Sequence, residues 1–237
     1  MAKIIFDIET VGENFEQLDE TTQEVLTRWI KREASSEEEY QVKLKDLKDG
    51  LGFSPFTGQI VAIGVLDYES KNGAVYFQNG GKKEEFEEDG IRFRSGSEKE
   101  CLENFWKVAL SAKEFISFNG RSFDAPYLVI RSAVHKIKPT KDLLSNRYLS
   151  SQKFDARHVD LMDQLTFYGA VWKKPSLHLV CHAFGIESSK GDGIDGDQVG
   201  QFFAKGKFLD IARYNVRDLF ATAKVYERWA EFINLQN

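Results

Sequence analysis

Cysteine is scarce in this sequence, with Cys101 and Cys181 as the only two among 237 residues. They lie far apart and match no metal-ligand or redox spacing. A secreted scaffold held together by disulfides is therefore excluded. A reducing compartment is favoured, because cysteines stay unpaired there.

Long hydrophobic runs are also missing. The first ten residues contain an apolar run of only three, Ile4 to Phe6, whereas the core of a secretion signal needs about 7–15. No stretch approaches the roughly 20 apolar residues that span a bilayer, and the mean hydropathy is -0.41. We expect a cytoplasmic protein that does not associate with membranes.

A strong excess of one charge is absent as well. The net charge of -5 argues against a protein that coats nucleic acid nonspecifically. The charge is nevertheless uneven, since residues 131–158 hold seven bases and two acids (+5) and residues 13–49 hold six bases and eleven acids (-5). This asymmetry permits one phosphate-attracting face on an acidic body, and solvated helix surfaces are the alternative with equal weight.

The remaining composition, 42% hydrophobic and 29% charged, is that of an ordinary globular protein. We find no internal repeat and no low-complexity tract, so the sequence predicts a single domain over residues 1–237. A polar segment at about 13–50 follows the first β-prone run. Its apolar spacing indicates two helices broken near Ser35, and we interpret it as a helical insertion after strand one.

The rest of the chain alternates between strand and helix patterns. The sequence predicts strands at 3–6, 60–68, 74–78 and 115–118, with a loop or hairpin at 80–96. It predicts helices at 97–112, 125–134, 177–184, 198–203 and 208–232, the first of them opened by a capping box at Ser97. This order indicates an α/β fold with layers of helices on a sheet.

Paired carboxylates stand at the end of the first predicted strand. Because side chains alternate along a strand, Asp7 and Glu9 project from one face, about 6–7 Å apart along the chain. Hard anions so placed repel one another unless cations neutralise them, and their oxygens suit Mg²⁺ or Mn²⁺ rather than Zn²⁺. An Asp-x-Glu pair by itself is more often structural or solvated.

Two further groups are ambiguous when taken singly. Tyr214 and Asp218 lie one turn apart on the last predicted helix, where an exposed tyrosine and an ordinary surface acid are the alternative. Asp124 follows a strand and the flexible Gly120, and it could serve simply as the N-cap of the next helix.

Together, and in this order, the segments FDIET (6–10), FNGRSFD (118–124) and YNVRD (214–218) resemble the three motifs of the DEDDy group of 3′–5′ exonucleases. The segments at 158–165, 176–186 and 212–229 look most like stand-alone exonucleases similar to the proofreading domains of family-B DNA polymerases. The resemblance covers nearly the whole chain. It implies a ribonuclease H-like fold, with a mixed five-stranded sheet flanked by helices.

The resemblance also implies an activity. It is that of a metal-dependent nuclease that hydrolyses single-stranded DNA ends to nucleoside monophosphates with two divalent cations, Mg²⁺ or Mn²⁺. The matching positions assign four metal ligands and a tyrosine that orients the attacking water, and they place three residues on the substrate side. The metal ligands are Asp7, Glu9, Asp124 and Asp218, the tyrosine is Tyr214, and the substrate-side residues are Thr10, Asn119 and Phe123.

Some alternatives stay open. An exoribonuclease could use the same site, because these motifs do not read the 2′-hydroxyl, and a catalytically silent nucleic-acid-binding module could keep the fold. The family often has an apolar residue six positions after the first aspartate, pressing on the terminal base. Here Glu13 occupies that position, and nearby Phe15 is the candidate substitute. We expect the basic stretch at 131–158 to guide the strand, and any polymerase or repair partner to be a separate chain.

Overall fold

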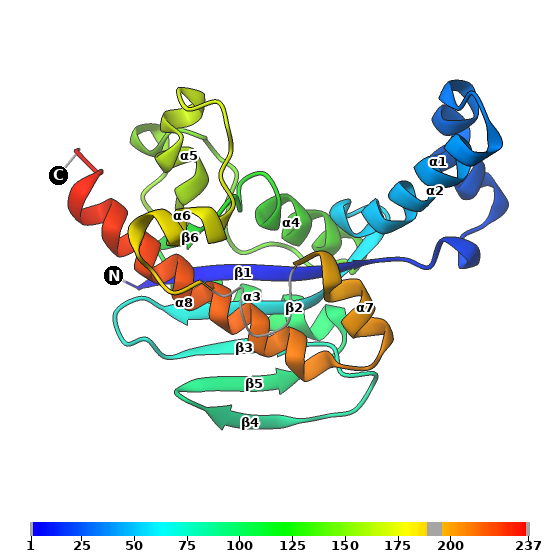
Figure 1. Ribbon diagram of the computed structural model, residues 1–237. Helices are drawn as coiled ribbons and strands as arrows, with labels where there is room; N and C mark the ends of the chain where they lie inside the picture. The colour runs from blue at the N-terminus through cyan, green and yellow to red at the C-terminus, as the bar shows by residue number, and fades with distance from the viewer. Residues whose placement is uncertain (1, 189–195, 236–237) are drawn as a thin grey trace.

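The computed structural model describes residues 2–188 and 196–235. A seven-stranded mixed sheet in the order β4-β5-β3-β2-β1-β6-β7 forms the centre of this part of the chain (Figure 1). The strands are β1 (Lys3–Gly12), β2 (Gly58–Asp67), β3 (Gly73–Phe77), β4 (Glu85–Glu88), β5 (Ile91–Ser95), β6 (Glu114–Ser117) and β7 (Arg157–Asp160).

Strand β1 lies between an antiparallel and a parallel neighbour. It pairs antiparallel with β2 and parallel with β6, which in turn pairs parallel with β7. Both faces of β1 are buried, so Ile4 and Phe6 point into one apolar core and Ile5 points into the other. This alternation decides which face of the sheet receives each polar side chain of β1.

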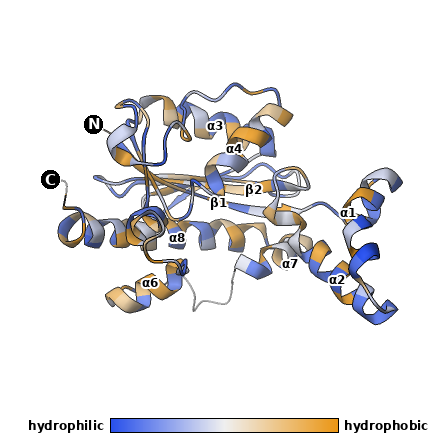
Figure 2. Ribbon diagram, turned by 90° about the horizontal axis from the view of Figure 1, so that it is seen from above, coloured by the Kyte–Doolittle hydropathy of each residue, from blue (hydrophilic) through white to orange (hydrophobic). Residues whose placement is uncertain are grey.

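Helices cover both faces of the sheet. Figure 2 shows α3 and α4 on one side and α8 on the other. The helices are α1 (Glu20–Glu33), α2 (Glu37–Gly50), α3 (Glu98–Ser111), α4 (Asp124–Val134), α5 (Leu161–Leu165), α6 (Leu177–Phe184), α7 (Val199–Ala204) and α8 (Phe208–Phe232), with short 3₁₀ turns at Phe15–Gln17, Leu51–Phe53, Leu149–Ser151, Phe167–Gly169 and Gly196–Gln198. Within the described residues, no helix has both the length and the apolar character needed to cross a bilayer.

Helices α1 and α2 form the predicted insertion between β1 and β2. They lie beyond the C-terminal end of β1 (Figure 1). Their starts are capped by Asp19 and Ser36, whose side chains accept hydrogen bonds from Thr22 N and Glu39 N. The break near Ser35 therefore lies where the sequence predicts it. That residues 1–237 form a single domain stays a prediction.

The predicted α/β layering is confirmed, but the expectation of five strands is too low. Residues 85–95 form the hairpin of β4 and β5, which adds two strands to one edge of the sheet through β3. The pattern at 80–96 left loop and hairpin open, because the segment is charged and flanked by glycines. The stacked rings of Phe86 and Phe93, 4.8 Å apart, stabilise the hairpin. Strand β7, of four residues, was not among the predicted strands.

Candidate active site

Three carboxylates from two distant parts of the chain meet between the sheet and α8. Asp7 and Glu9 point from β1 toward this helix, and Asp218 points back from it. Each offers an oxygen atom, and these atoms all lie within 4.8 Å of one another. Glu9 is 7% exposed and Asp218 is 9% exposed. The predicted convergence of the first and third motifs is therefore present in the fold.

Asp124 joins the same region from the other side of β1. It is the first residue of α4, and its Oδ1 accepts a hydrogen bond from Ile8 N at 3.0 Å. Ile8 stands between Asp7 and Glu9, so this bond fixes Asp124 beside the pair. The N-cap position of α4 is Phe123, and the alternative that Asp124 merely caps the helix is wrong.

Burial and mutual repulsion make this cluster electrostatically unbalanced. Burial, followed by the charges of Asp124, Glu9 and Asp218, raises the pKa of Asp7 well above its usual value. Burial and the charges of Asp218 and Asp124 do the same to the pKa of Glu9. Burial raises the pKa of Asp124 to about 7, against the hydrogen bond from Ile8 N. Four crowded carboxylates with oxygen donors are a ligand set that fits hard divalent cations.

Tyr214 lies one turn before Asp218 on α8 and is 5% exposed. Its hydroxyl forms a hydrogen bond with the Asp218 side chain. Burial, then the charges of Asp218, Glu9 and Asp7, raises the pKa of the Tyr214 phenol far above its usual value. The phenol therefore keeps its proton at neutral pH and acts as a hydrogen-bond donor, not as a full base.

Asn215 is a site residue that the sequence did not single out. It is fully buried, and its Nδ2 donates to Asp7 Oδ2 at 2.7 Å. Gly64 of β2 lies against this amide, where a Cβ atom would collide with Asn215 Oδ1. The amide thus fixes the orientation of the Asp7 carboxylate. A polar residue on the mostly apolar buried face of this amphipathic helix was the available signal.

Asp160 holds the turn that leads to Asp124. It ends β7, and its carboxylate accepts hydrogen bonds from Asn119 N and Arg121 N, each at 2.9 Å. Asn119 has φ +64°, a conformation that non-glycine residues seldom adopt. These bonds hold Asn119 in that conformation, and the turn can then present Asp124 to β1.

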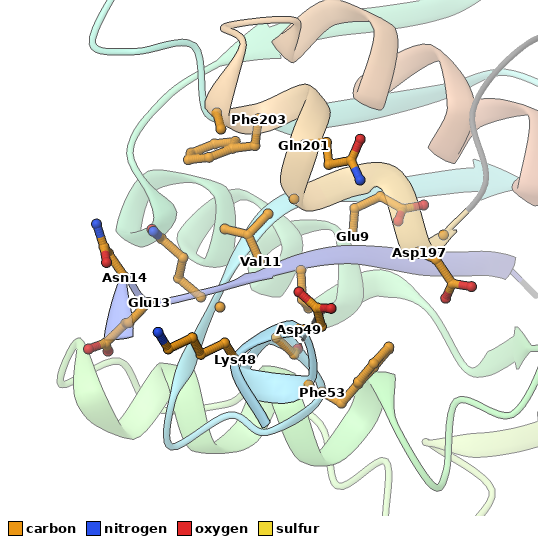
Figure 3. A pocket seen from close by; sticks show the side chains of 18 of the residues that line it. Glu9, Val11, Glu13, Asn14, Lys48, Asp49, Phe53, Asp197, Gln201 and Phe203 are labelled. Atoms are coloured by element: carbon orange, nitrogen blue, oxygen red, sulfur yellow. Dashed lines mark hydrogen bonds between the residues drawn. The ribbon is translucent and has the colours of Figure 1, made fainter. Parts of the chain in front are cut away.

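A cleft of about 1280 Å³ extends from Glu9 past the end of β1, between the residues around α2 and those around α7 (Figure 3). Thr10 and Phe123 line it, whereas Asn119 is not among the described lining residues. The Phe123 ring also packs 5.4 Å from the ring of Tyr127. That these three residues contact substrate stays a prediction.

One wall of the cleft is the 3₁₀ turn Leu51–Phe53, which is fastened to the body. Tyr127 donates its hydroxyl to Gly52 O at 3.0 Å and to Ser54 O at 3.1 Å, and Thr10 Oγ1 donates to Gly52 O at 2.8 Å. Phe53 lines the cleft and is 66% exposed. The turn thus holds an apolar ring beside solvent.

The cleft is acidic. Figure 3 shows Glu9, Glu13, Asp49 and Asp197 around it, and Asp46 lines it as well. Of the described lining residues, Lys48 is the one cation, and it pairs with Glu16 at 2.6 Å. Phe15, the candidate substitute for the missing apolar residue at position 13, is 9% exposed beneath Lys48. Phe15 is not among the described residues that line the cleft, and its contact with a terminal base stays a prediction.

Known proteins resemble this chain in sequence and in fold. Residues 56–234 match a family described as a predicted 3′–5′ exonuclease related to the exonuclease domain of PolB, a range that includes Asp124, Tyr214 and Asp218. The fold is similar to part of the family B DNA polymerase from the hyperthermophilic archaeon Pyrobaculum calidifontis, with a TM-score of 0.59 and 16% identity. The match covers 97% of this chain and 24% of the polymerase, so the chain spans about a quarter of its length. No curated protein matches the sequence.

Proposed function

The chain belongs to the family of predicted 3′–5′ exonucleases related to the exonuclease domain of PolB, and from this premise we propose that it hydrolyses single-stranded DNA ends to nucleoside monophosphates by a two-metal mechanism. The observation that carries this proposal is the meeting of Asp7, Glu9 and Asp218 oxygens within 4.8 Å, with Asp124 fixed beside them.

The carboxylates have distinct roles in this proposal. Asp7 would help to hold both cations, Glu9 and Asp218 would help to hold one of them, and Asp124 would act mainly on the other through water. Two divalent ions, Mg²⁺ or Mn²⁺, supply charge neutralisation for the attacking and leaving oxygens of an in-line displacement at phosphorus. Asn215 keeps the Asp7 carboxylate in one orientation through its 2.7 Å hydrogen bond.

Tyr214 orients the attacking water. Its buried hydroxyl stays protonated beside Asp218, and a positioned donor of this kind favours one orientation of a neighbouring water molecule. Water is the nucleophile, and no cysteine or serine is required. Cys101 and Cys181 are unpaired and buried, which supports a reducing, cytoplasmic environment.

DNA is favoured over RNA because the matched family is related to a DNA polymerase domain. An exoribonuclease is the second candidate, since the carboxylates do not read the 2′-hydroxyl. A silent binding module is disfavoured, because all five residues of the three motifs are present and four of them are carboxylates in one buried region.

The test compares end-labelled single strands of DNA and RNA with the same sequence, each with Mg²⁺, with Mn²⁺ and with a chelator. We expect mononucleotide release from the 3′ end of DNA with either cation and none with the chelator. Mg²⁺ should also raise the melting temperature, because it binds the folded cluster and not the unfolded chain. Unchanged hydrolysis after exhaustive chelation would refute the two-metal proposal, and faster release from RNA would favour the exoribonuclease.

A further inference from the structure

The three parallel strands β1, β6 and β7 begin in one row at the edge of the sheet. Lys3 is in register with Glu114, and Glu114 is in register with Arg157. Side chains in register point to the same face of a sheet. One acid therefore lies between two cations that come from widely separated parts of the chain.

A cavity of about 310 Å³ opens at this row, and we name it the edge pocket. Lys113 and Lys153 line it together with the row, so four cations surround one described acid. Glu114 lies 3.8 Å from Lys3 and 3.9 Å from Arg157, and it also accepts the Tyr226 hydroxyl at 2.9 Å. One carboxylate cannot balance four cations, which leaves a local charge of +3.

Arg157 has a further unmet requirement. Its Nε is buried and has no hydrogen-bond partner within the described structure. A buried donor without an acceptor is costly, because it has lost its hydrogen bonds to water. The Arg157 side chain as a whole is 41% exposed, so an anionic oxygen in the edge pocket can meet the terminal guanidinium nitrogens and place negative charge beside the buried Nε.

An aromatic ring stands at the same place. Phe154 lines the edge pocket and is 84% exposed. An exposed ring beside excess cations is the combination that single-stranded nucleic acids use, because phosphates meet the cations and a base stacks on the ring. A simple inorganic anion would have no use for the ring.

The edge pocket lies on the α8 side of the sheet, as the carboxylates do. Leu149, which lines it, belongs to the core beneath α8. Along β1, Lys3 is four residues from Asp7, about 13 Å at 3.3 Å per residue. Along α8, Tyr226 is eight residues from Asp218, about 12 Å at 1.5 Å per residue. A stacked strand with a phosphate every 3.4 Å needs at least about four nucleotides to cover this separation.

We propose that the edge pocket binds a nucleotide unit, with its phosphate on the cations of Lys113, Lys153 and Arg157 and its base on Phe154. The unit is an internal nucleotide of the strand whose 3′ end lies at the carboxylates, so this inference rests on the proposed function. A free nucleoside monophosphate has the same chemistry, and the experiment separates the two sources.

The experiment measures binding of labelled thymidine oligonucleotides of two to twelve residues, with a chelator present so that no strand is cut. The Lys113→Ser/Lys153→Ser variant should weaken binding of the long strands about tenfold and reduce the salt slope by about 0.7 for each phosphate that it no longer binds. Dinucleotides should bind it as they bind the wild type. A parallel titration with thymidine monophosphate tests the free nucleotide.

One control variant and two substitutions of Phe154 test whether the result is specific to the edge pocket. Lys99→Ser/Lys107→Ser removes the same charge from α3, on the other face of the sheet, and should leave binding nearly unchanged. Phe154→Leu keeps an apolar side chain but loses the ring, so it should weaken the long strands, whereas Phe154→Trp should retain them. Lys99, Lys107 and Phe154 all have exposed side chains, so these substitutions should leave the fold intact.

Three outcomes decide the proposal. A length-dependent loss in the Lys113/Lys153 variant supports the strand. A loss of monophosphate binding with unchanged strand binding overturns the strand and identifies a free nucleotide as the ligand. If Lys113→Ser/Lys153→Ser and Lys99→Ser/Lys107→Ser weaken binding equally, the edge pocket is not a nucleotide-binding site and the proposal is overturned. A wild type that binds long strands through the edge pocket but never hydrolyses them would refute the proposed function alone.

Discussion

The cleft beside Glu9 and the edge pocket beside Lys3 differ in the sign of their charge. The cleft is lined by five acids and one cation among its described residues, and that cation already pairs with Glu16. The described residues that line the edge pocket include four cations and one acid. If both receive parts of one strand, the negative charge of its 3′ end and that of its internal nucleotides are neutralised in different ways.

This difference separates two sources of binding energy. Near the carboxylates, the protein adds negative charge to a negative substrate, so divalent cations must provide the attraction. At the edge pocket, side-chain cations provide it directly, with the salt dependence of counterion release. The proposed enzyme would therefore hold the body of the strand without metal and would need metal only for its reacting end.

The local charges of the sequence contribute to this arrangement. The acidic segment 13–49 supplies Glu13, Asp46 and Asp49 to the cleft. The basic stretch 131–158, expected to guide the strand, supplies Lys153 and Arg157 to the edge pocket. Because Lys3 and Lys113 join them from elsewhere in the chain, the basic site cannot be recognised from that stretch alone.

Removing a carboxylate should produce the largest effect. Asp7→Asn or Asp218→Asn should lower hydrolysis on the order of 10⁴-fold, because residues that act as a unit fail together. Single-turnover rates on labelled DNA measure this, with Asp210→Asn on the same helix as control. Without cations, the melting temperature should stay the same or rise, since a mutually repelling buried charge is gone. Substantial hydrolysis by either variant would mean that the strand is cut at a site other than these carboxylates.

Tyr214→Phe should have the next largest effect. It removes one hydroxyl and keeps the ring, so the rate should fall by about 10²–10⁴-fold, the range for a positioned proton-handling group. Strand affinity and the cation concentration for half-maximal rate should stay unchanged. Rates across a Mg²⁺ titration provide the check. If excess Mg²⁺ restores the rate, the tyrosine supports cation binding and does not orient water.

Glu98→Gln should destabilise the cleft side of the molecule. Glu98 is 6% exposed and accepts hydrogen bonds from Arg131, at 2.8 Å, and from Ile60 N. Arg131 also donates to Pro55 O in the loop that follows the cleft wall. Breaking such a buried pair costs about 3 kcal/mol of unfolding free energy, about 150-fold in the equilibrium constant. Denaturant titration measures the loss, and strand binding at the edge pocket by the folded variant should persist.

The unfolding free energy lost in Glu98→Gln should be large at pH 7 and should shrink as the pH falls. Burial acts to raise the pKa of Glu98, but hydrogen bonds from Arg131, His135 and Ile60 N outweigh it and hold the pKa below its usual value. A carboxyl with a lowered folded pKa stabilises the protein above its unfolded pKa, about 4.3. That contribution disappears as the pH falls through the folded pKa. Wild type and variant should thus differ at pH 7 and converge in acid, and a constant difference would contradict this origin.

Neutralising acidic residues of the cleft should give the smallest effect, and it should strengthen function where the other variants weaken it. Asp46→Asn/Asp49→Asn should strengthen strand binding about threefold at low salt, because partly exposed charges are strongly screened. Glu69→Gln/Glu87→Gln makes the same change in net charge away from the cleft and should do less. Fluorescence anisotropy at two salt concentrations measures both. Equal gains would mean that total charge, and not the cleft, sets the affinity.

The sequence by itself predicted most of the local elements and singled out the candidate site residues. Alternation along β1 places Asp7 and Glu9 on one face, and helical spacing places Tyr214 one turn from Asp218. The capping box at Ser97 opens α3 as predicted. These features depend on neighbours within a few residues, so they can be read from the chain without knowledge of its folding.

Only the tertiary structure decided which groups meet. The hydrogen bond from Asn215 to Asp7 joins residues 208 positions apart, and the one from Asn119 to Asp160 joins residues 41 positions apart. The position of Phe15 beneath Lys48 and the row of Lys3, Glu114 and Arg157 likewise depend on how separate segments pack. Such contacts form because burying apolar faces brings β1, β6, β7 and α8 together, and polar side chains then take the partners that this packing leaves within reach.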